Sequence, residues 1–170
     1  KRRVNPNDSM NGSYLGPSFE NSQIEHELRL MNVNFKKYNE NDLIDILANE
    51  LSKEKTIGWF QGRMEFGPRA LGARSILADP RSSNMQKELN LKVKFRESFR
   101  PFAPSVLSEE ANNWFNLKDL SPYMLMVAEI KKELQIPMTR EQENLFGINK
   151  LNIKRSKIPA VTHVDFSARI

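Results

Sequence analysis

The sequence predicts a protein of the α/β class, in which helices flank a mixed twisted sheet. Strand-like runs alternate with helix-like runs, and the strand-like runs are rich in β-branched and aromatic residues. The chain has 170 residues, 39% of them apolar and 28% charged, which suits one core and argues against wholesale disorder. We therefore expect one domain over residues 13–170, after a tail at 1–12.

The first half of the chain predicts two helices and a strand. Apolar residues recur every three or four positions over 21–31 and again over 39–52, where an asparagine at 39 or 41 can cap the helix. Residues 56–60 are β-branched and aromatic, which indicates a buried strand. Residues 75–80 fit either a strand or a helical turn that ends before Pro80.

The second half predicts helices at 85–93 and 108–115 and strands at 102–107, 124–130 and 158–165. Between the last two strands, residues 131–157 are charged, rich in asparagine and without an apolar period. We expect a long insertion or mobile loop there. Because the chain stops soon after its last predicted strand, we expect an incomplete domain.

Positive charge gathers in one part of the chain. The net charge is +5, and residues 61–101 alone hold nine basic and four acidic residues, so the remainder is neutral. This window should attract an anionic partner. The chain has no cysteine and only two histidines, His26 and His163, so we expect neither a thiolate site nor a multi-histidine metal site. No apolar run is long enough for a membrane span or a signal peptide, and we expect a cytoplasmic protein.

Residues 61–73 combine glycine with arginine. Four of the seven glycines fall within fifteen residues, which predicts a shaped loop. Arg63, Arg69 and Arg74 each follow one of these glycines closely. Glycine allows a ligand to approach the backbone, and the planar guanidinium pairs with phosphate or carboxylate oxygens. Pro68 and Arg69 stand where a P-loop requires Lys-Ser/Thr, so this loop is no Walker A motif, and the chain also lacks a GxGxxG dinucleotide motif.

A second cationic segment lies at residues 92–102, where four basic residues alternate with phenylalanines. Such a segment could stack bases and bind a nucleic-acid backbone, so a single-stranded nucleic-acid-binding module is an alternative function. Alternatively, the segment has no binding function: Phe95, Phe99 and Phe102 then belong to the core, and the basic side chains are solvated. A scaffold or dimerisation domain with an incidental basic strip is the third possibility.

Four motifs resemble the C-terminal domain of the O-carbamoyltransferase family, which includes nodulation-factor and antibiotic carbamoyltransferases. They are GWFQGRMEFGPRALG at 58–72, RSILADPR at 74–81, FRESFRPFAP at 95–104 and PAVTHVD at 159–165. The resemblance covers about 13–170; it is dense over 56–107, weak before 50 and absent over 131–157. Phe166 and Ser167 depart from it, because a Gly-Thr pair is more usual there.

The resemblance implies a YrdC-like fold and a two-part enzyme. A missing N-terminal domain, actin-like and metal-containing, would transfer the carbamoyl group to a hydroxyl acceptor. The present domain would form carbamoyl-adenylate from carbamoyl phosphate and ATP, with Mg²⁺ arriving on ATP and no metal site of its own. The implied partners are these two substrates and the missing domain; a membrane is not among them, and nucleic acid is not favoured.

The site residues follow from the loop and the resemblance together. We expect Arg63, Arg69 and Arg74 to be catalytic, contacting phosphate and carbamoyl groups. The expected substrate-binding residues are Ser75, Lys94, Arg96, Arg100 and His163. Glu65, inside the loop, is expected to orient Arg63 or Arg69 rather than to act as an acid or base.

Overall fold

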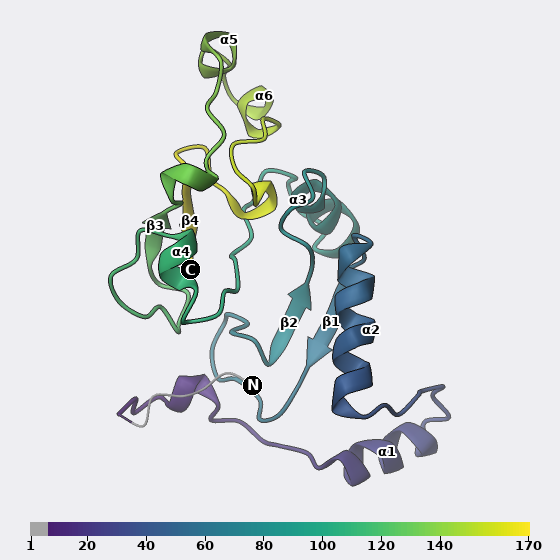
Figure 1. Ribbon diagram of the computed structural model, residues 1–170. Helices are drawn as coiled ribbons and strands as arrows, with labels where there is room; N and C mark the ends of the chain where they lie inside the picture. Colours follow the sequence, from purple (N-terminus) through teal and green to yellow (C-terminus); the bar gives the residue numbers. More distant parts are fainter. Residues whose placement is uncertain (1–6) are drawn as a thin grey trace. The chain divides into compact units, whose positions relative to one another are not determined.

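The computed structural model describes residues 7–170 (Figure 1). The first six residues of the predicted tail lie outside the described residues. The chain divides into two compact units, Lys1–Leu77 and Ala78–Ile170. Each unit contains helices and strands, so the mixed α/β class is confirmed. Within residues 7–170 the strands form two separate antiparallel pairs, instead of the single mixed sheet that the sequence suggested.

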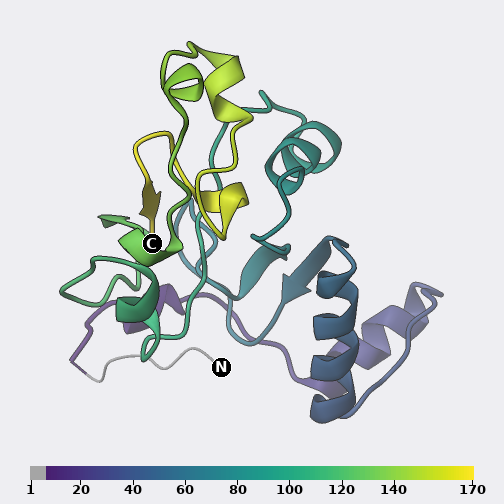
Figure 2. The same ribbon diagram turned by 45° about the horizontal axis from the view of Figure 1, so that its top comes forward.

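The first unit contains the short 3₁₀ turn η1 (Asn11–Ser13), the helices α1 (Asn21–Leu30) and α2 (Glu40–Ser52), and the strands β1 (Ile57–Phe60) and β2 (Arg74–Leu77). Both predicted helices are confirmed. The side chain of Asn39 caps α2 by accepting a hydrogen bond from the Asp42 amide at 2.9 Å. Helix α2 runs beside β1 in both views (Figures 1 and 2).

Strands β1 and β2 form an antiparallel pair. Ile57 faces Leu77 at one end, and Phe60 faces Arg74 at the other. The run at 75–80 is thus a strand and not a helical turn. Residues 61–73 connect the two strands, so pairing brings both ends of the glycine-arginine segment together at one end of the sheet.

The second unit is built from short elements. Its helical segments are α3 (Met85–Glu88), the π-helical turn η2 (Leu89–Val93), α4 (Ala111–Trp114), η3 (Lys132–Leu134), α5 (Arg140–Glu143), α6 (Ile148–Leu151) and η4 (Pro159–Val161). Strands β3 (Val127–Glu129) and β4 (Ser167–Arg169) pair antiparallel. The predicted helix at 85–93 is confirmed, while the helix at 108–115 shortens to α4 and the strand at 124–130 to β3.

Two predictions for the second unit are wrong. Residues 102–107 form no strand, because Pro104 interrupts the run and removes a backbone donor. Residues 158–165 form the 3₁₀ helix η4 and a turn, since Pro159 occupies the first helical position and suits a helix start. The segment 131–157, expected to be a long insertion or mobile loop, contains the short helical elements η3, α5 and α6, and its mobility stays a prediction.

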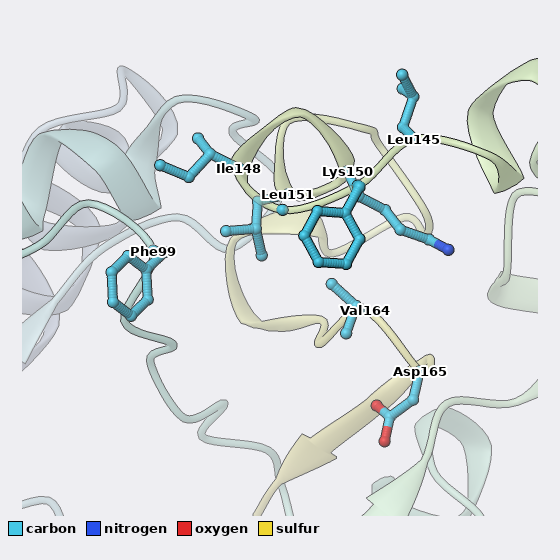
Figure 3. Close-up of a pocket in the computed structure, with 9 residues that line it drawn as sticks. Phe99, Leu145, Ile148, Lys150, Leu151, Val164 and Asp165 are labelled. Atoms are coloured by element: carbon cyan, nitrogen blue, oxygen red, sulfur yellow. The ribbon is translucent and has the colours of Figure 1, made fainter.

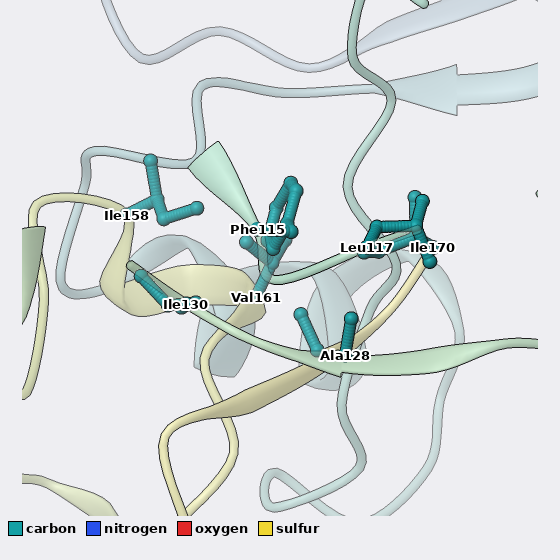
Figure 4. Close-up of a cluster of buried hydrophobic side chains, with 8 residues drawn as sticks. Phe115, Leu117, Ala128, Ile130, Ile158, Val161 and Ile170 are labelled. Carbon is teal, nitrogen blue, oxygen red and sulfur yellow. The ribbon is translucent and has the colours of Figure 1, made fainter. Parts of the chain in front are cut away.

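The main core of the second unit joins the β3–β4 pair to the segments around it (Figure 4). Phe115 and Ile130 are fully buried at its centre. The other members are Leu117, Ala128, Ile158, Val161, Ala168 and Ile170. A smaller cluster of Met85, Leu89 and Ala160 packs η4 against α3. The turn between η4 and β4 is therefore held by core contacts at both of its ends.

Candidate anion-binding site

The loop at 61–73 has the shaped conformation that its glycines predicted. Gly62, Gly67 and Gly72 have φ angles of +63°, +128° and +120°. The values at Gly67 and Gly72 lie in a region that side-chain-bearing residues rarely adopt. Glycine at these two positions therefore determines the course of the loop.

Glu65 holds this loop from the inside. Its side chain is buried, and its carboxylate accepts hydrogen bonds from the Leu71 amide at 3.0 and 2.9 Å and from the Ala73 amide at 2.9 Å. An ionised carboxylate only accepts hydrogen bonds, so it is suited to gathering backbone donors. The backbone of residues 71–73 is thereby wrapped around one buried acidic group.

The segment around Gly16 braces the other side of the loop. The Gly16 amide donates to the Met64 carbonyl at 3.0 Å, and the Met64 amide donates to the Pro17 carbonyl at 2.9 Å. A Cβ atom at position 16 would lie 2.8 Å from Met64 Cβ, so the close approach requires glycine. This contact joins two segments that are almost fifty residues apart in sequence.

The three predicted arginines of the loop differ in what holds them. Arg63 Nε donates to the Gly16 carbonyl, and Arg74 Nη2 donates to the Gly67 carbonyl at 3.0 Å. Arg69 is exposed and makes no hydrogen bond or ion pair with any residue over 7–170. Arg69 is therefore the loop arginine whose whole guanidinium is available to a ligand.

The expected partnership of Glu65 with Arg63 or Arg69 is wrong. Its carboxylate lies 3.6 Å from Arg74 Nε, and its two best-placed partners are backbone amides. Ser75 follows Arg74 on β2 and faces Trp59 on β1. Ser75 is half-buried, and its hydroxyl makes no hydrogen bond within the described part of the chain, so its contact with a ligand stays a prediction.

Asn90 organises the second cationic segment, and sequence reasoning missed it. Its side chain is fully buried on η2, and Nδ2 donates to the Ser98 carbonyl at 3.1 Å and to the Arg100 carbonyl at 2.8 Å. Its Oδ1 accepts from Arg96 Nε at 2.6 Å. In the sequence, the sole sign of this role is that Asn90 is a polar residue next to Leu89 within a helical run. Leu89 is buried in the structure.

The cations of this segment also divide into held and free side chains. The Arg96 guanidinium lies 5.0 Å from the Phe102 ring centroid, and Arg100 Nε donates to a Glu97 oxygen at 2.8 Å. Lys94 is exposed, and its ammonium group has no partner among residues 7–170. The interpretation of the phenylalanines as core is wrong for Phe95 and Phe99, which are 84% and 48% exposed, while Phe102 does pack against both core clusters.

His163 lies in the turn between η4 and β4 and not in a strand. Its Nδ1 atom is 3.0 Å from Ser167 Oγ. Burial lowers the pKa of His163, opposed by the Asp165 carboxylate and reinforced by Arg169 and Arg155. Phe166 has a φ of +62°, a backbone conformation that glycine adopts more readily than a residue with a side chain.

An apolar pocket of about 540 Å³ opens beside this turn in the second unit (Figure 3). Phe99, Ile148, Leu151 and Val164 contribute apolar walls, and Asp165 contributes a carboxylate at the edge. The Ser167 hydroxyl donates to that carboxylate and lowers the pKa of Asp165. A flat apolar group with a polar rim fits such a pocket.

The predicted site residues fall into two groups. Arg63, Arg69, Arg74 and Ser75 belong to the first unit, and Lys94, Arg96, Arg100 and His163 belong to the second. Over residues 7–170, no three His, Cys, Asp or Glu side chains gather in a way that could hold a metal ion. No helix over the same residues has the length and apolar character needed to cross a membrane.

The structure is that of a mixed α/β protein, and each unit has an exposed cation in its predicted site, Arg69 in the first and Lys94 in the second, whose side chain has no partner among residues 7–170. Residues 48–170 match the family model described as the carbamoyltransferase C-terminus. The chain therefore belongs to the carbamoyltransferase family, as its motifs predicted. The match runs through residues 131–157, where the sequence alone gave no resemblance.

Curated relatives cover nearly the whole chain. The chain is 56% identical over 172 residues to an uncharacterised protein, sll1178, of Synechocystis, covering 100% of this chain and 28% of that protein. It is 38% identical to the nodulation protein NolNO of Sinorhizobium fredii, over 97% of this chain and 22% of that protein. It is 37% identical to the nodulation protein NolO of Bradyrhizobium diazoefficiens, over 99% and 28%. The chain thus spans 22–28% of the length of these relatives.

Proposed function

We propose that this chain is the part of an ATP-dependent O-carbamoyltransferase that binds carbamoyl phosphate and ATP and forms carbamoyl-adenylate. Another part of a longer protein would then transfer the carbamoyl group to a hydroxyl acceptor. The observation that carries the proposal is the free guanidinium of Arg69 on a loop that Glu65 and three glycines hold in shape. Membership of the carbamoyltransferase family supplies the chemical class.

Both proposed substrates are anions that bear phosphate. Arg69 can pair with phosphate oxygens in a planar, two-point fashion, which a lysine cannot reproduce. Arg63 and Arg74 are tied to the backbone carbonyls of Gly16 and Gly67, so they shape the loop and add positive charge around Arg69. In the second unit, Lys94 offers a free ammonium to the same class of ligand.

The proposed reaction has a simple mass balance. Water releases phosphate from carbamoyl phosphate and leaves carbamate, and a carbamate oxygen then attacks the α-phosphorus of ATP. Pyrophosphate leaves, so the products are carbamoyl-adenylate, phosphate and pyrophosphate. Such a step is catalysed mainly by positioning and by cations that face developing negative charge. Mg²⁺ prefers phosphate oxygens and would enter with ATP.

The apolar pocket beside Phe99 is our candidate for the adenine ring. Phe99, Ile148 and Val164 supply apolar surface, and the pocket volume of about 540 Å³ lies within the range of small-ligand pockets. Stacking of a base on an aromatic ring contributes about 1–3 kcal/mol. Because the reaction consumes ATP and carbamoyl phosphate, we expect it in the cytoplasm, where both are made.

The test is carbamoyl-phosphate-dependent exchange of labelled pyrophosphate into ATP, catalysed by the 170-residue chain with Mg²⁺. Arg69→Ala and Arg69→Lys should both lower the exchange rate by at least about tenfold, since the lysine keeps the charge but loses the planar fork. Lys36→Ala is the matched control, because Lys36 is an exposed cation of the same unit without a partner among residues 7–170. Equal rates in all variants would indicate that Arg69 does not bind the substrates.

One observation favours a second candidate, single-stranded nucleic-acid binding by residues 92–102. Phe95 is exposed next to the free Lys94, so a base could stack there beside a cation. A thermal-shift comparison of ATP, carbamoyl phosphate and a short oligonucleotide separates the two functions. Stabilisation by the oligonucleotide alone, falling steeply with salt, would favour this candidate over the enzyme.

A further inference from the structure

A chain of hydrogen bonds fixes the imidazole of His163. Ser167 Oγ donates to Asp165 Oδ1 at 2.7 Å and lies 3.0 Å from His163 Nδ1. The Ser167 amide also donates to Asp165 Oδ1, at 3.1 Å. The turn is closed by the His163 amide, which donates to the Ser167 carbonyl at 2.8 Å. The three side chains are thus held within one short turn of backbone.

The tautomer of His163 follows from the number of protons available in this series of hydrogen bonds. A serine hydroxyl has one proton, and here it is used on the carboxylate of Asp165, which accepts only. The same hydroxyl must then accept the proton of His163 Nδ1. Neutral His163 consequently carries its hydrogen on Nδ1 and a lone pair on Nε2.

The charged groups around His163 bear on its protonation. Asp165 favours the imidazolium, whereas Arg155, Arg169 and burial favour the neutral ring, and the net effect is a lowered pKa. The ordinary value is 6.5, so a lowered pKa favours the neutral ring at pH 7. The lone pair on Nε2 is therefore present at the pH of the cell.

Nε2 is also open to a ligand. It makes no hydrogen bond within the described part of the chain. Over the same residues Arg74 Nε is the one buried side-chain nitrogen or oxygen without a hydrogen-bond partner, so His163 Nε2, which also lacks one, is not buried. An accessible, unpartnered acceptor on a fixed ring is suited to a ligand that donates a hydrogen bond.

We propose that His163 Nε2 accepts a hydrogen bond from the amino group of carbamoyl phosphate, and that Ser167 and Asp165 are the positioning residues that hold this tautomer. The proposal rests on the proposed function, because it names the part of that substrate that His163 contacts. The phosphate group of the substrate offers acceptor oxygens, which a lone pair repels, while the carbamoyl amino group offers two donors. His163 therefore sets the orientation of the substrate and distinguishes a carbamoyl group, which has an amino group, from an acetyl group, which has a methyl group.

The first test is direct observation of the tautomer in the 170-residue chain, labelled with ¹⁵N in its imidazole rings. His26 gives the second signal, and His26→Gln assigns it. We expect His163 to carry its proton on Nδ1 at pH 7. Ser167→Ala should convert this signal to a mixture of tautomers, and Ser167→Thr should restore it because threonine keeps the hydroxyl. A proton on Nε2 in the unsubstituted chain would overturn the proposal.

The second test compares the binding of carbamoyl phosphate with that of acetyl phosphate, in which a methyl group replaces the amino group. His163→Leu should weaken carbamoyl phosphate binding by about tenfold, the value of one hydrogen bond, and leave acetyl phosphate binding unchanged. Ser167→Ala should act in the same direction, and Ser167→Thr should recover the preference. Equal losses for both ligands would refute the role of His163 but leave the proposed function standing, whereas failure of the unsubstituted chain to bind either ligand would refute both.

Discussion

Substitution of Glu65 should destabilise the first unit, because this side chain holds the loop at 61–73. Glu65→Ala removes the carboxylate that accepts hydrogen bonds from the Leu71 and Ala73 amides. An unsatisfied donor costs about 1–3 kcal/mol, so the two together cost about 2–6 kcal/mol. The ion pair to Arg74 adds at most about 1 kcal/mol, because its 3.6 Å separation is long and the Arg74 side chain is 30% exposed.

Glu65→Gln should remove only part of this stabilisation. The amide keeps one oxygen, and Oε1 accepts from both Leu71 and Ala73. The new NH₂ group, however, would stand where Oε2 now meets the Leu71 amide and Arg74 Nε, so donors would face donors. We expect a loss of about 1–3 kcal/mol, between the unsubstituted chain and Glu65→Ala.

The assay is urea unfolding followed by the fluorescence of Trp59, in a Trp114→Phe background that leaves one tryptophan in the chain. Hydrogen exchange at the Leu71 and Ala73 amides should speed up in parallel, which separates local opening from global unfolding. Glu27→Gln is the control, because Glu27 is an exposed acid on α1 of the same unit. Losses below about 0.5 kcal/mol in both Glu65 variants would show that the carboxylate does not hold the loop.

Three further predictions concern the second unit. Asn90→Ala should lower the free energy of unfolding in urea by about 2–4 kcal/mol, because the Ser98 and Arg100 carbonyls and Arg96 Nε lose a hydrogen-bond partner. An unchanged midpoint would contradict this. Arg81→Ala should lower the midpoint of thermal unfolding slightly, because the nearly buried Asp79 loses a two-point partner. An equal loss in Asp79→Asn would support the pairing. For His163, whose pKa is lowered, the unfolded chain binds a proton that the native chain does not, so stability should fall as the pH drops from about 7 to 5. His163→Gln should flatten that slope, and an unchanged slope would count against the lowered pKa.

The elements that sequence predicted correctly depend on local physics. Helix α2 has an apolar stripe and an asparagine cap within a single stretch of chain, and both signals survive in the structure. The loop at 61–73 was predictable because the freedom to adopt positive φ angles, which its glycines use, is a property of glycine itself. The motifs within it also identified the family, which the match over 48–170 confirms.

The predictions that failed depend on neighbours or on proline. Residues 158–165 look like a strand by composition, yet Pro159 starts a 3₁₀ helix whose Ala160 and Val161 fill the core. Glu65 and Asn90 look like surface residues in sequence and prove to be buried. Each binds backbone groups of a loop farther along the chain, and no periodicity within either segment encodes such a contact.

The distinction between held and free cations is also invisible in the sequence, and it changes what a substitution measures. Arg63, Arg74 and Arg96 donate to the backbone or to a buried side chain, so truncation of any of them should lower both stability and ligand binding. Arg69 and Lys94 have no such partners among residues 7–170, so their truncation should lower binding while the unfolding midpoint stays the same. A paired measurement of binding and unfolding for these five variants therefore separates cations that build the site from cations that contact the ligand. If Arg69→Ala lowered the unfolding midpoint as much as Arg74→Ala, Arg69 would belong to the first group, and the candidate site would have to be assigned elsewhere.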